Sequence, residues 1–190
     1  MPFAFPSESA FAFAGILTFL QNLGFMSGPG GTPIAWVLGH AVAFGYSAFA
    51  ILNIPMVREH CCALSAAKVL SLAAAFAAAI VEEAFFRRLV MDTLSAAGIS
   101  TAGQIFGSGL LFGLAHGVWG IVTGRFVPGC GAVIATGILG TALGVVYVAG
   151  ERSLAPVIVS HFLITATIQP GILFAAFSGQ MPRPRAGWWR

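Results

Sequence analysis

The amino-acid sequence predicts an all-α, polytopic transmembrane bundle of helices with a polar site inside the membrane. Of its 190 residues, 58% are hydrophobic and only 8% are charged, and the mean hydropathy is +0.92. An ordinary soluble domain carries about 25% charged residues. Each of four stretches without Asp, Glu, Lys or Arg also exceeds the roughly 20 residues that a helix needs to cross a bilayer. They are residues 9–57, 93–124, 126–150 and 153–182.

Residues typical of turns divide these stretches into helices. The first stretch is long enough for two crossings, and Gly and Pro between Ser27 and Pro33 separate them. Further breaks are expected at Asn53-Ile54-Pro55, Gly98-Ile99-Ser100, Val127-Pro128-Gly129 and Gln169-Pro170-Gly171. We therefore expect helices near 8–26, 34–52, 61–94, 100–118, 130–149 and 154–168, with a shorter piece at 171–179. Because that last piece is too short to cross unaided, the number of membrane segments is six or seven.

We expect residues 1–190 to form a single integral-membrane domain that ends in a basic, aromatic C-terminal tail, residues 180–190. Basic and aromatic residues gather in this tail, where a membrane protein carries its anchors: Arg183, Arg185, Trp188, Trp189 and Arg190. The positive-inside rule therefore predicts a cytoplasmic C-terminus. The net charge of +3 is explained by this anchoring, so the expected surroundings are a lipid bilayer and no nucleic acid.

The strongest functional signal is the segment Glu82-Glu83-Ala84-Phe85-Phe86-Arg87-Arg88, which holds four of the fifteen charged residues. A charge at membrane depth costs about 2.5–3.5 kcal/mol on insertion scales, so an intramembrane carboxylate is a functional candidate. Glu83 and Arg87 are spaced i, i+4 and can neutralise each other on one helix face. Glu82 points to another face, where it would be a carboxylate without a local cation, suited to accept a proton. Alternatively, both glutamates merely end the span at the membrane interface.

Two histidines in charge-free helices, His116 and His161, favour a catalytic site. Helix bundles build polar sites from side chains that project inward from different helices. Glu82 and His116 could activate a water molecule while His161 stabilises the oxyanion of a tetrahedral intermediate. The same three residues could instead bind zinc, or relay protons in a transporter without hydrolysis. Since the chain lacks the HExxH spacing, we expect a site without a metal or other cofactor, with zinc held by Glu82, His116 and His161 as the alternative.

At these positions the sequence resembles the CAAX protease and bacteriocin-processing family of membrane proteins, which includes the type II CAAX prenyl endopeptidases. Glu82 to Arg87 resembles the family's EExxxR motif, and Phe112 to His116 resembles its FxxxH motif. His161 resembles the third-motif histidine and follows a family-like Ser-Leu-Ala-Pro sequence. The resemblance covers about residues 64–168, the family-like catalytic core.

The resemblance implies a glutamate-type intramembrane endopeptidase in which Glu82 is the general base, His116 helps to activate water and His161 lies in the oxyanion site. Side chains that would shape the site or hold substrate are Glu83, Arg87 and Phe112. The family usually has Asn four residues after the third-motif histidine, whereas this chain has Thr165. A threonine hydroxyl donates one hydrogen bond but reaches less far than an amide. The second oxyanion donor is then Thr165 or another group such as Gln169.

The implied substrate is a membrane-associated peptide or protein. The short loops suit a multi-pass protein of a prokaryotic cell membrane. Two other functions stay open from the sequence: a proton-coupled membrane transporter, and a catalytically silent immunity or scaffold protein of the same family, which the replacement by Thr165 makes plausible.

Overall fold

The computed structural model describes residues 30–62, 66–122 and 126–177, together with residues 15, 17–19 and 21. Throughout the ranges from residue 30 onward, every regular element is a helix, so the predicted all-α class is confirmed. The elements are α2 (Pro33–Asn53), α3 (Pro55–His60), α4 (Ala66–Glu83), the π-helix η1 (Ala84–Met91), α5 (Asp92–Ala96), α6 (Thr101–His116), α7 (Val118–Val122), α8 (Phe126–Ala149) and α9 (Ala155–Phe177). Most of the predicted helix 8–26 and all of the tail 180–190 lie outside the described residues.

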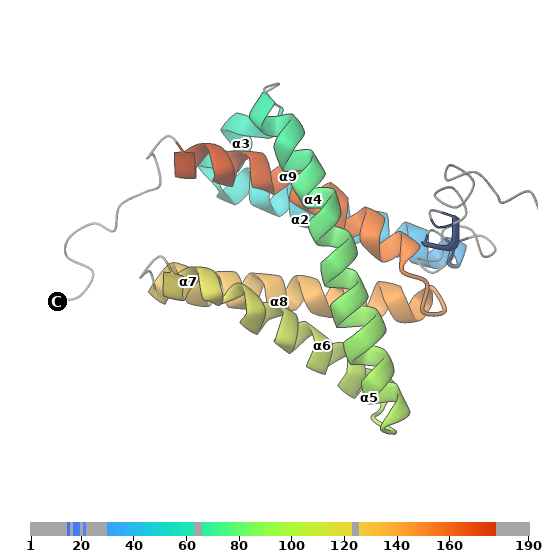
Figure 1. The fold of residues 1–190 in the computed structure, drawn as a ribbon. Helices are drawn as coiled ribbons and strands as arrows, with labels where there is room; N and C mark the ends of the chain where they lie inside the picture. The colour runs from blue at the N-terminus through green and yellow to red at the C-terminus, as the bar shows by residue number, and fades with distance from the viewer. Residues whose placement is uncertain are drawn as a thin grey trace, which may run out of the picture.

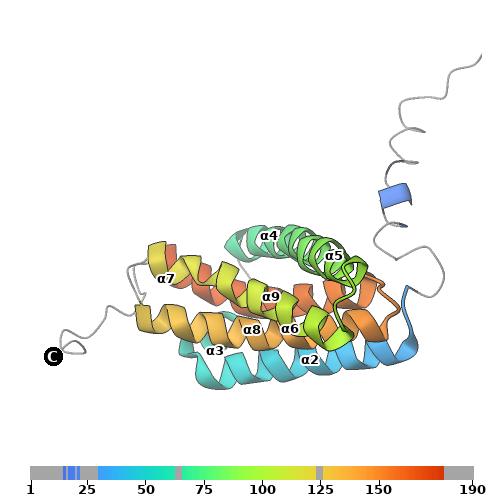
Figure 2. The same cartoon turned by 90° about the horizontal axis from the view of Figure 1, so that it is seen from below.

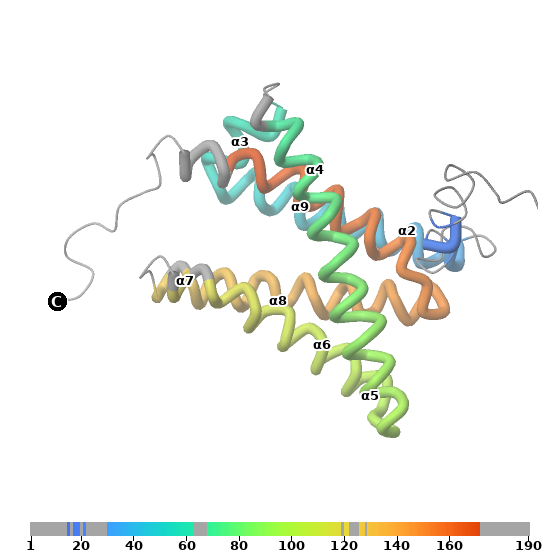
Figure 3. Tube along the Cα trace, viewed as in Figure 1, coloured from blue at the N-terminus to red at the C-terminus, as the bar shows by residue number. Residues whose placement is uncertain are grey.

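Two helix pairs form the body of the bundle, α2 with α9 and α6 with α8, and the continuous rod α4–η1–α5 crosses both pairs (Figure 1). Seen from below, this rod lies on one side of the bundle and α2 on the opposite side (Figure 2). Helix α9 packs against α2, α3, α4 and α8. The Cα trace shows where α4 passes close to α9 and η1 close to α6 (Figure 3). Segments 66–96, 101–116 and 155–177 thus meet near the crossing point.

Among the residues that the structure describes, three helical segments are long and apolar enough to cross a membrane: Pro33–Asn53, Lys68–Ala96 and Gly129–Ala149. Large apolar side chains also point outward, and three of them, Leu52, Leu70 and Ile121, are 77%, 73% and 82% exposed. Such an outer surface is expected in lipid and is unfavourable in water. The chain is an integral membrane protein, and a total of six or seven crossings stays a prediction.

Helices α6 and α8 approach closely because glycines line their seam. A Cβ atom on Gly113 of α6 would lie 2.5 Å from the Val133 carbonyl oxygen and 2.9 Å from the Cα of Gly137. On α8, a Cβ atom on Gly140 would lie 2.9 Å from the Cβ of Phe112. Small residues let helix backbones approach in lipid, where van der Waals contact drives association. This seam fixes the helix that carries Phe112 and His116.

Three of the predicted breaks are confirmed. Ile54 is extended between α2 and α3, and Gly98 adopts a positive φ of 76° between α5 and α6. In the part of the first break that the structure describes, Gly30 and Gly31 have positive φ and Thr32 caps α2, accepting a hydrogen bond from the Ala35 amide.

The predicted break at Gln169-Pro170-Gly171 is wrong, because α9 runs through it to Phe177. Helices 154–168 and 171–179 are therefore one helix as far as the described residues reach. Gly171 lies where the backbone of α3 crosses, since a Cβ atom there would be 2.6 Å from the Met56 carbonyl oxygen. The Pro-Gly pair thus permits close packing, and proline is tolerated within membrane helices.

The other differences concern helix ends. Helix α8 begins at Phe126, so the predicted break at 127–129 falls in its first turn, where the missing N–H of Pro128 leaves no helical bond unmade. The predicted helix 61–94 is observed from Ala66 to Ala96, and its middle is π-helical. A π-helical segment inserts a residue into the helical repeat and often marks a functional site.

A polar cluster holds the turn between α8 and α9. Arg152 Nη1 donates to Asp92 Oδ1 at 2.5 Å, and Arg152 Nη2 donates to Gln104 Oε1 at 2.6 Å. The Tyr147 hydroxyl also donates to Asp92. Glu151 and Arg152 adopt positive φ angles of 53° and 63° in this turn. These contacts tie the start of α9 to α5 and α6.

Candidate active site

Glu82 and Glu83 are the last two residues of α4, directly before the π-helix η1, which carries Arg87. Glu83 is completely buried, and so is Arg87. Arg87 Nε donates to Glu83 Oε2 at 2.7 Å, the i, i+4 pair that the sequence predicts. The guanidinium therefore compensates the buried negative charge of Glu83.

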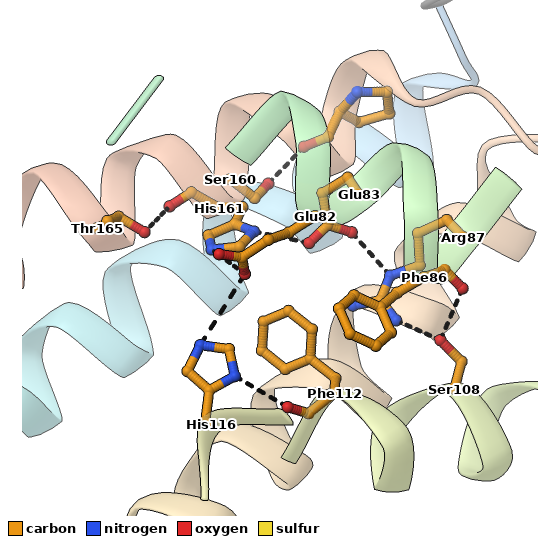
Figure 4. Close-up of polar contacts among 11 residues, drawn as sticks. Glu82, Glu83, Phe86, Arg87, Ser108, Phe112, His116, Ser160, His161 and Thr165 are labelled. Atoms are coloured by element: carbon orange, nitrogen blue, oxygen red, sulfur yellow. Dashed lines mark hydrogen bonds and ion pairs between the residues drawn. The ribbon is translucent and has the colours of Figure 1, made fainter. Parts of the chain in front are cut away.

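The second oxygen of Glu83 contacts a distant helix. Glu83 Oε1 lies 2.7 Å from His161 Nδ1 on α9 (Figure 4). His161 is 5% exposed. Because Arg87 favours the ionised form of Glu83, the carboxylate accepts and the His161 Nδ1–H donates. Glu83 thus fixes the orientation of the His161 ring.

Arg87 also reaches α6. Its Nη1 donates to the Ser108 hydroxyl oxygen at 2.6 Å, and the Ser108 hydroxyl donates to the Phe86 carbonyl at 2.9 Å. Ser108 is completely buried. The hydrogen-bonded chain from Ser108 through Arg87 and Glu83 to His161 joins α6, η1, α4 and α9; we call it the buried relay.

Glu82 lies beside this relay and faces both histidines. Its side chain is 30% exposed, but its Oε2 atom is buried and has no hydrogen-bond partner among the described residues. This oxygen lies 3.9 Å from His116 Nε2 and 3.8 Å from His161 Nε2. Both distances are too long for direct hydrogen bonds and suit one intervening water molecule, since two atoms about 3.9 Å apart can each lie about 2.8 Å from its oxygen.

The hydrogen bonds made by the two Nδ1 atoms decide how the rings present Nε2. His116 Nδ1 lies 2.8 Å from the Phe112 carbonyl oxygen, which can only accept. Nδ1 therefore carries the proton, and Nε2 of the neutral ring is an acceptor. The same holds for neutral His161, whose Nδ1 donates to Glu83. Three hydrogen-bond acceptors therefore face one another: Glu82 Oε2, His116 Nε2 and His161 Nε2. A molecule that donates hydrogen bonds, such as water, fits between them.

The Phe112 ring packs against both imidazoles and against the Arg87 guanidinium. It is 1% exposed, and its ring centroid lies 4.6 Å from that of His116 and 5.7 Å from that of His161. The Arg87 guanidinium carbon lies 5.5 Å from the same centroid. A buried aromatic ring in this position keeps the imidazoles apart and shields the ion pair from solvent.

Thr165 and Gln169 are not brought against Glu82. The Thr165 hydroxyl donates to the His161 carbonyl at 3.0 Å, a bond within α9 that uses its only proton. Gln169 lies eight residues beyond His161 on the same helix, about 12 Å along the axis at 1.5 Å per residue. The backbones of Gln169 and His161 are thus more than two helical turns apart, and Gln169 Oε1 is buried without a hydrogen-bond partner among the described residues.

Sequence reasoning missed Ser108. Residues four apart share a helix face, so Ser108, Phe112 and His116 form one line along α6. That spacing was the available signal. A small hydroxyl residue in a glycine-rich helix is otherwise indistinguishable from a packing residue.

The glutamate and the two histidines do not match a zinc site closely. Tetrahedral zinc with ligands at about 2.0–2.1 Å requires ligand atoms about 3.4 Å apart, compared with 3.9 and 3.8 Å here. Within residues 30–62, 66–122 and 126–177, no group of three His, Cys, Asp or Glu side chains could hold a metal ion.

The comparisons with known proteins bear on the same segments. A family model described as type II CAAX prenyl endopeptidase Rce1-like matches residues 64–167, which is more than half of the chain. The matched region includes the whole buried relay as well as Glu82, His116 and Thr165. No curated protein and no solved structure gave a significant match.

Proposed function

The chain belongs to the Rce1-like family of type II CAAX prenyl endopeptidases, and from this membership we propose that it hydrolyses a peptide bond of a membrane-associated peptide or protein within the bilayer. Glu82 is the general base, His116 assists in activating water, and His161 stabilises the oxyanion. The observation that carries this proposal is the position of Glu82 Oε2, buried and unpartnered among the described residues, between the Nε2 atoms of two imidazoles.

The first step uses Glu82 and His116. A water molecule between them donates one hydrogen bond to the carboxylate and one to His116 Nε2. As its oxygen attacks the scissile carbonyl carbon, its proton passes to Glu82, and the carbonyl oxygen becomes an oxyanion. His116 suits this role because the neutral Phe112 carbonyl fixes its tautomer without adding charge.

His161 suits the oxyanion for a different reason. Its Nδ1–H is held by Glu83, so its Nε2 can donate only when the ring is an imidazolium. The Glu83 carboxylate stabilises that cation, although it shares its charge with Arg87. His161 Nε2–H then donates to the oxyanion, and Glu82 returns its proton to the leaving amine.

One observation favours the catalytically silent alternative. The proton of the Thr165 hydroxyl is used on the His161 carbonyl, so Thr165 gives no second oxyanion donor unless it rotates. Loss of one such donor costs about 10²–10³ in rate. We propose a protease with a weaker oxyanion site than an amide at this position would give.

The test is cleavage of a membrane-anchored peptide by purified protein in liposomes, with proton flux and peptide binding measured on the same preparation. Cleavage that disappears in Glu82→Gln supports the proposal. Proton flux without products would establish the transporter instead. Binding without products in both wild type and Glu82→Gln would establish the silent protein.

A further inference from the structure

We propose that Ser108 is a positioning residue for His161: acting through Arg87 and Glu83, it holds the proton of the neutral ring on Nδ1 and so directs Nε2 toward Glu82. The inference deepens the proposed function and rests on it for the role of His161. The hydrogen-bonded path itself is independent of that function.

The path consists of three contacts between buried groups. They join Ser108 Oγ to Arg87 Nη1 at 2.6 Å, Arg87 Nε to Glu83 Oε2 at 2.7 Å, and Glu83 Oε1 to His161 Nδ1 at 2.7 Å. Ser108, Arg87 and Glu83 have no exposed surface. Water does not compete for hydrogen bonds between such buried groups. A change at Ser108 therefore alters the hydrogen bond at His161.

Glu83 divides its two oxygens between two partners. Oε2 serves Arg87, and Oε1 serves His161. Glu83 can keep Oε1 for His161 only if the terminal nitrogens of Arg87 have an acceptor other than Glu83. Ser108 supplies it for Nη1, whereas Nη2 has no partner among the described residues.

Removal of the Ser108 hydroxyl would leave two terminal nitrogens of a buried guanidinium without acceptors. A charged acceptor within reach is the carboxylate that the guanidinium already contacts, and planar guanidinium groups readily bind carboxylates through two nitrogens. A rotation of Glu83 toward Arg87 would take Oε1 from His161. The imidazole would then lose the acceptor that holds its proton on Nδ1.

Ser108 also anchors the π-helix. Its hydroxyl donates to the carbonyl of Phe86, one residue before Arg87. The same side chain thus accepts from Arg87 and fixes the backbone that presents it. A residue serving only to fill space would make neither bond.

The chain offers a matched control in Ser160. It is 2% exposed and directly precedes His161, but its hydroxyl donates to the Pro156 carbonyl of its own helix at 2.6 Å. Ser160→Ala therefore removes the same atoms at the same depth, nearer to His161, without touching the relay.

The experiment records the ring nitrogens of His161 by ¹⁵N NMR on full-length, histidine-labelled protein in lipid nanodiscs, at a pH where the ring is neutral. The signals are assigned by their loss in His161→Gln. Wild type, Ser160→Ala and the hydroxyl-conserving Ser108→Thr should show the Nδ1–H tautomer. Ser108→Ala should lower its population. Because the imidazolium that donates to the oxyanion would also lose its contact with Glu83, kcat for peptide cleavage should fall about tenfold with KM within about twofold, as expected for one charge-assisted hydrogen bond.

An unchanged His161 tautomer in Ser108→Ala would overturn the proposal, whatever the activity. Wild-type protein with the proton on Nε2 would overturn it as well. If Ser108→Ala does not fold, Ser108→Cys fills the site with a slightly larger atom, replaces the hydroxyl by a weak hydrogen-bonding group and is judged by the same signals. Because the NMR result needs no turnover, an inactive wild type would refute the proposed function and leave this test readable.

Discussion

Glu83 Oε1 and His161 Nδ1 lie 2.7 Å apart, joining residues separated by 78 positions in the sequence. The neighbouring Glu82 faces the other nitrogen of the same ring at 3.8 Å. Two consecutive carboxylates thus lie against one imidazole and have different surroundings. Glu83 is buried beside Arg87, whereas Glu82 is half-buried and forms no ion pair with a Lys or Arg among the described residues. Carboxylates in such contrasting environments take different chemical roles.

Substitution of the proposed base should abolish most of the activity. We expect Glu82→Gln and His116→Ala each to lower kcat by about 10²–10⁴, the usual contribution of general acid–base groups. The measurement is initial-rate cleavage of a membrane-anchored peptide. Glu59→Gln, which changes an exposed carboxylate on α3, should retain wild-type activity. Full activity in Glu82→Gln would remove the base from the mechanism.

The buried ion pair makes a prediction about stability. Arg87→Met leaves the Glu83 charge uncompensated in a buried site, and we expect a loss of about 3–5 kcal/mol in the free energy of unfolding. The double variant Glu83→Gln, Arg87→Met should be less destabilised than Arg87→Met, because it no longer buries an unpaired charge. Denaturant titration in detergent measures both. A double variant that loses the sum of the two single losses would show that the pair is not coupled.

The sequence predicted the helical class and the main charge pair because both follow from local rules. Hydropathy and turn residues mark helices, and an i, i+4 spacing brings Glu83 and Arg87 together on any helix. The continuity of α9 through Pro170 could not be predicted from local rules, and the close contact of Gly171 with α3 is seen only in the tertiary structure. A Pro-Gly pair usually marks the end of a helix, and nothing in the local sequence distinguishes this pair from one that does.

For the site, the sequence identified the residues but not their hydrogen-bond partners. On an ideal helix, Glu82 and Glu83 diverge by about 100°, which predicts separate surroundings. In the structure both reach His161, and the residues on the helix face of Glu82 differ in burial, with Phe86 buried but Phe85 and Leu89 exposed. The π-helix directly after Glu83 and the contact with α9 are both tertiary features, so spacing alone could not give this arrangement.

Removal of metal ions distinguishes the metal-free mechanism from the zinc-dependent one. Because the Glu82 oxygen and the histidine nitrogens are spaced for a bridging water molecule, we expect peptide cleavage to persist after incubation with a strong zinc chelator and dialysis. Glu82→Asp, with a shorter reach, should lower kcat similarly with and without added zinc. Activity that is lost on chelation and returns with zinc would establish the metal version.

The glycine seam between α6 and α8 should tolerate no added atoms. Gly113→Ala places a methyl group 2.5 Å from the Val133 carbonyl oxygen, and we expect a loss of about 1–3 kcal/mol in the free energy of unfolding, as for other overpacked sites. Gly131→Ala, on α8, has no neighbouring atom within 4 Å and should be neutral or slightly stabilising. Unfolding in detergent, followed by circular dichroism, compares the two. If Gly113→Ala were as stable as Gly131→Ala, α6 and α8 could move apart at the seam at little cost in free energy.

The α8–α9 turn allows backbone strain to be measured apart from side-chain bonds. Arg152 adopts a φ of 63° while its guanidinium contacts Asp92 and Gln104, so the side-chain contacts hold the residue in a conformation that disfavours a Cβ atom. Arg152→Ala and Arg152→Gly lose the same hydrogen bonds, but only glycine relieves the left-handed backbone, whose cost is about 1–2 kcal/mol for other residues. We therefore expect both variants to be less stable than wild type, and Arg152→Gly to be more stable than Arg152→Ala by about 1 kcal/mol in the free energy of unfolding. If alanine were as stable as glycine, the turn would relax once the guanidinium is gone, and the polar cluster rather than the chain geometry would set the start of the helix that carries His161.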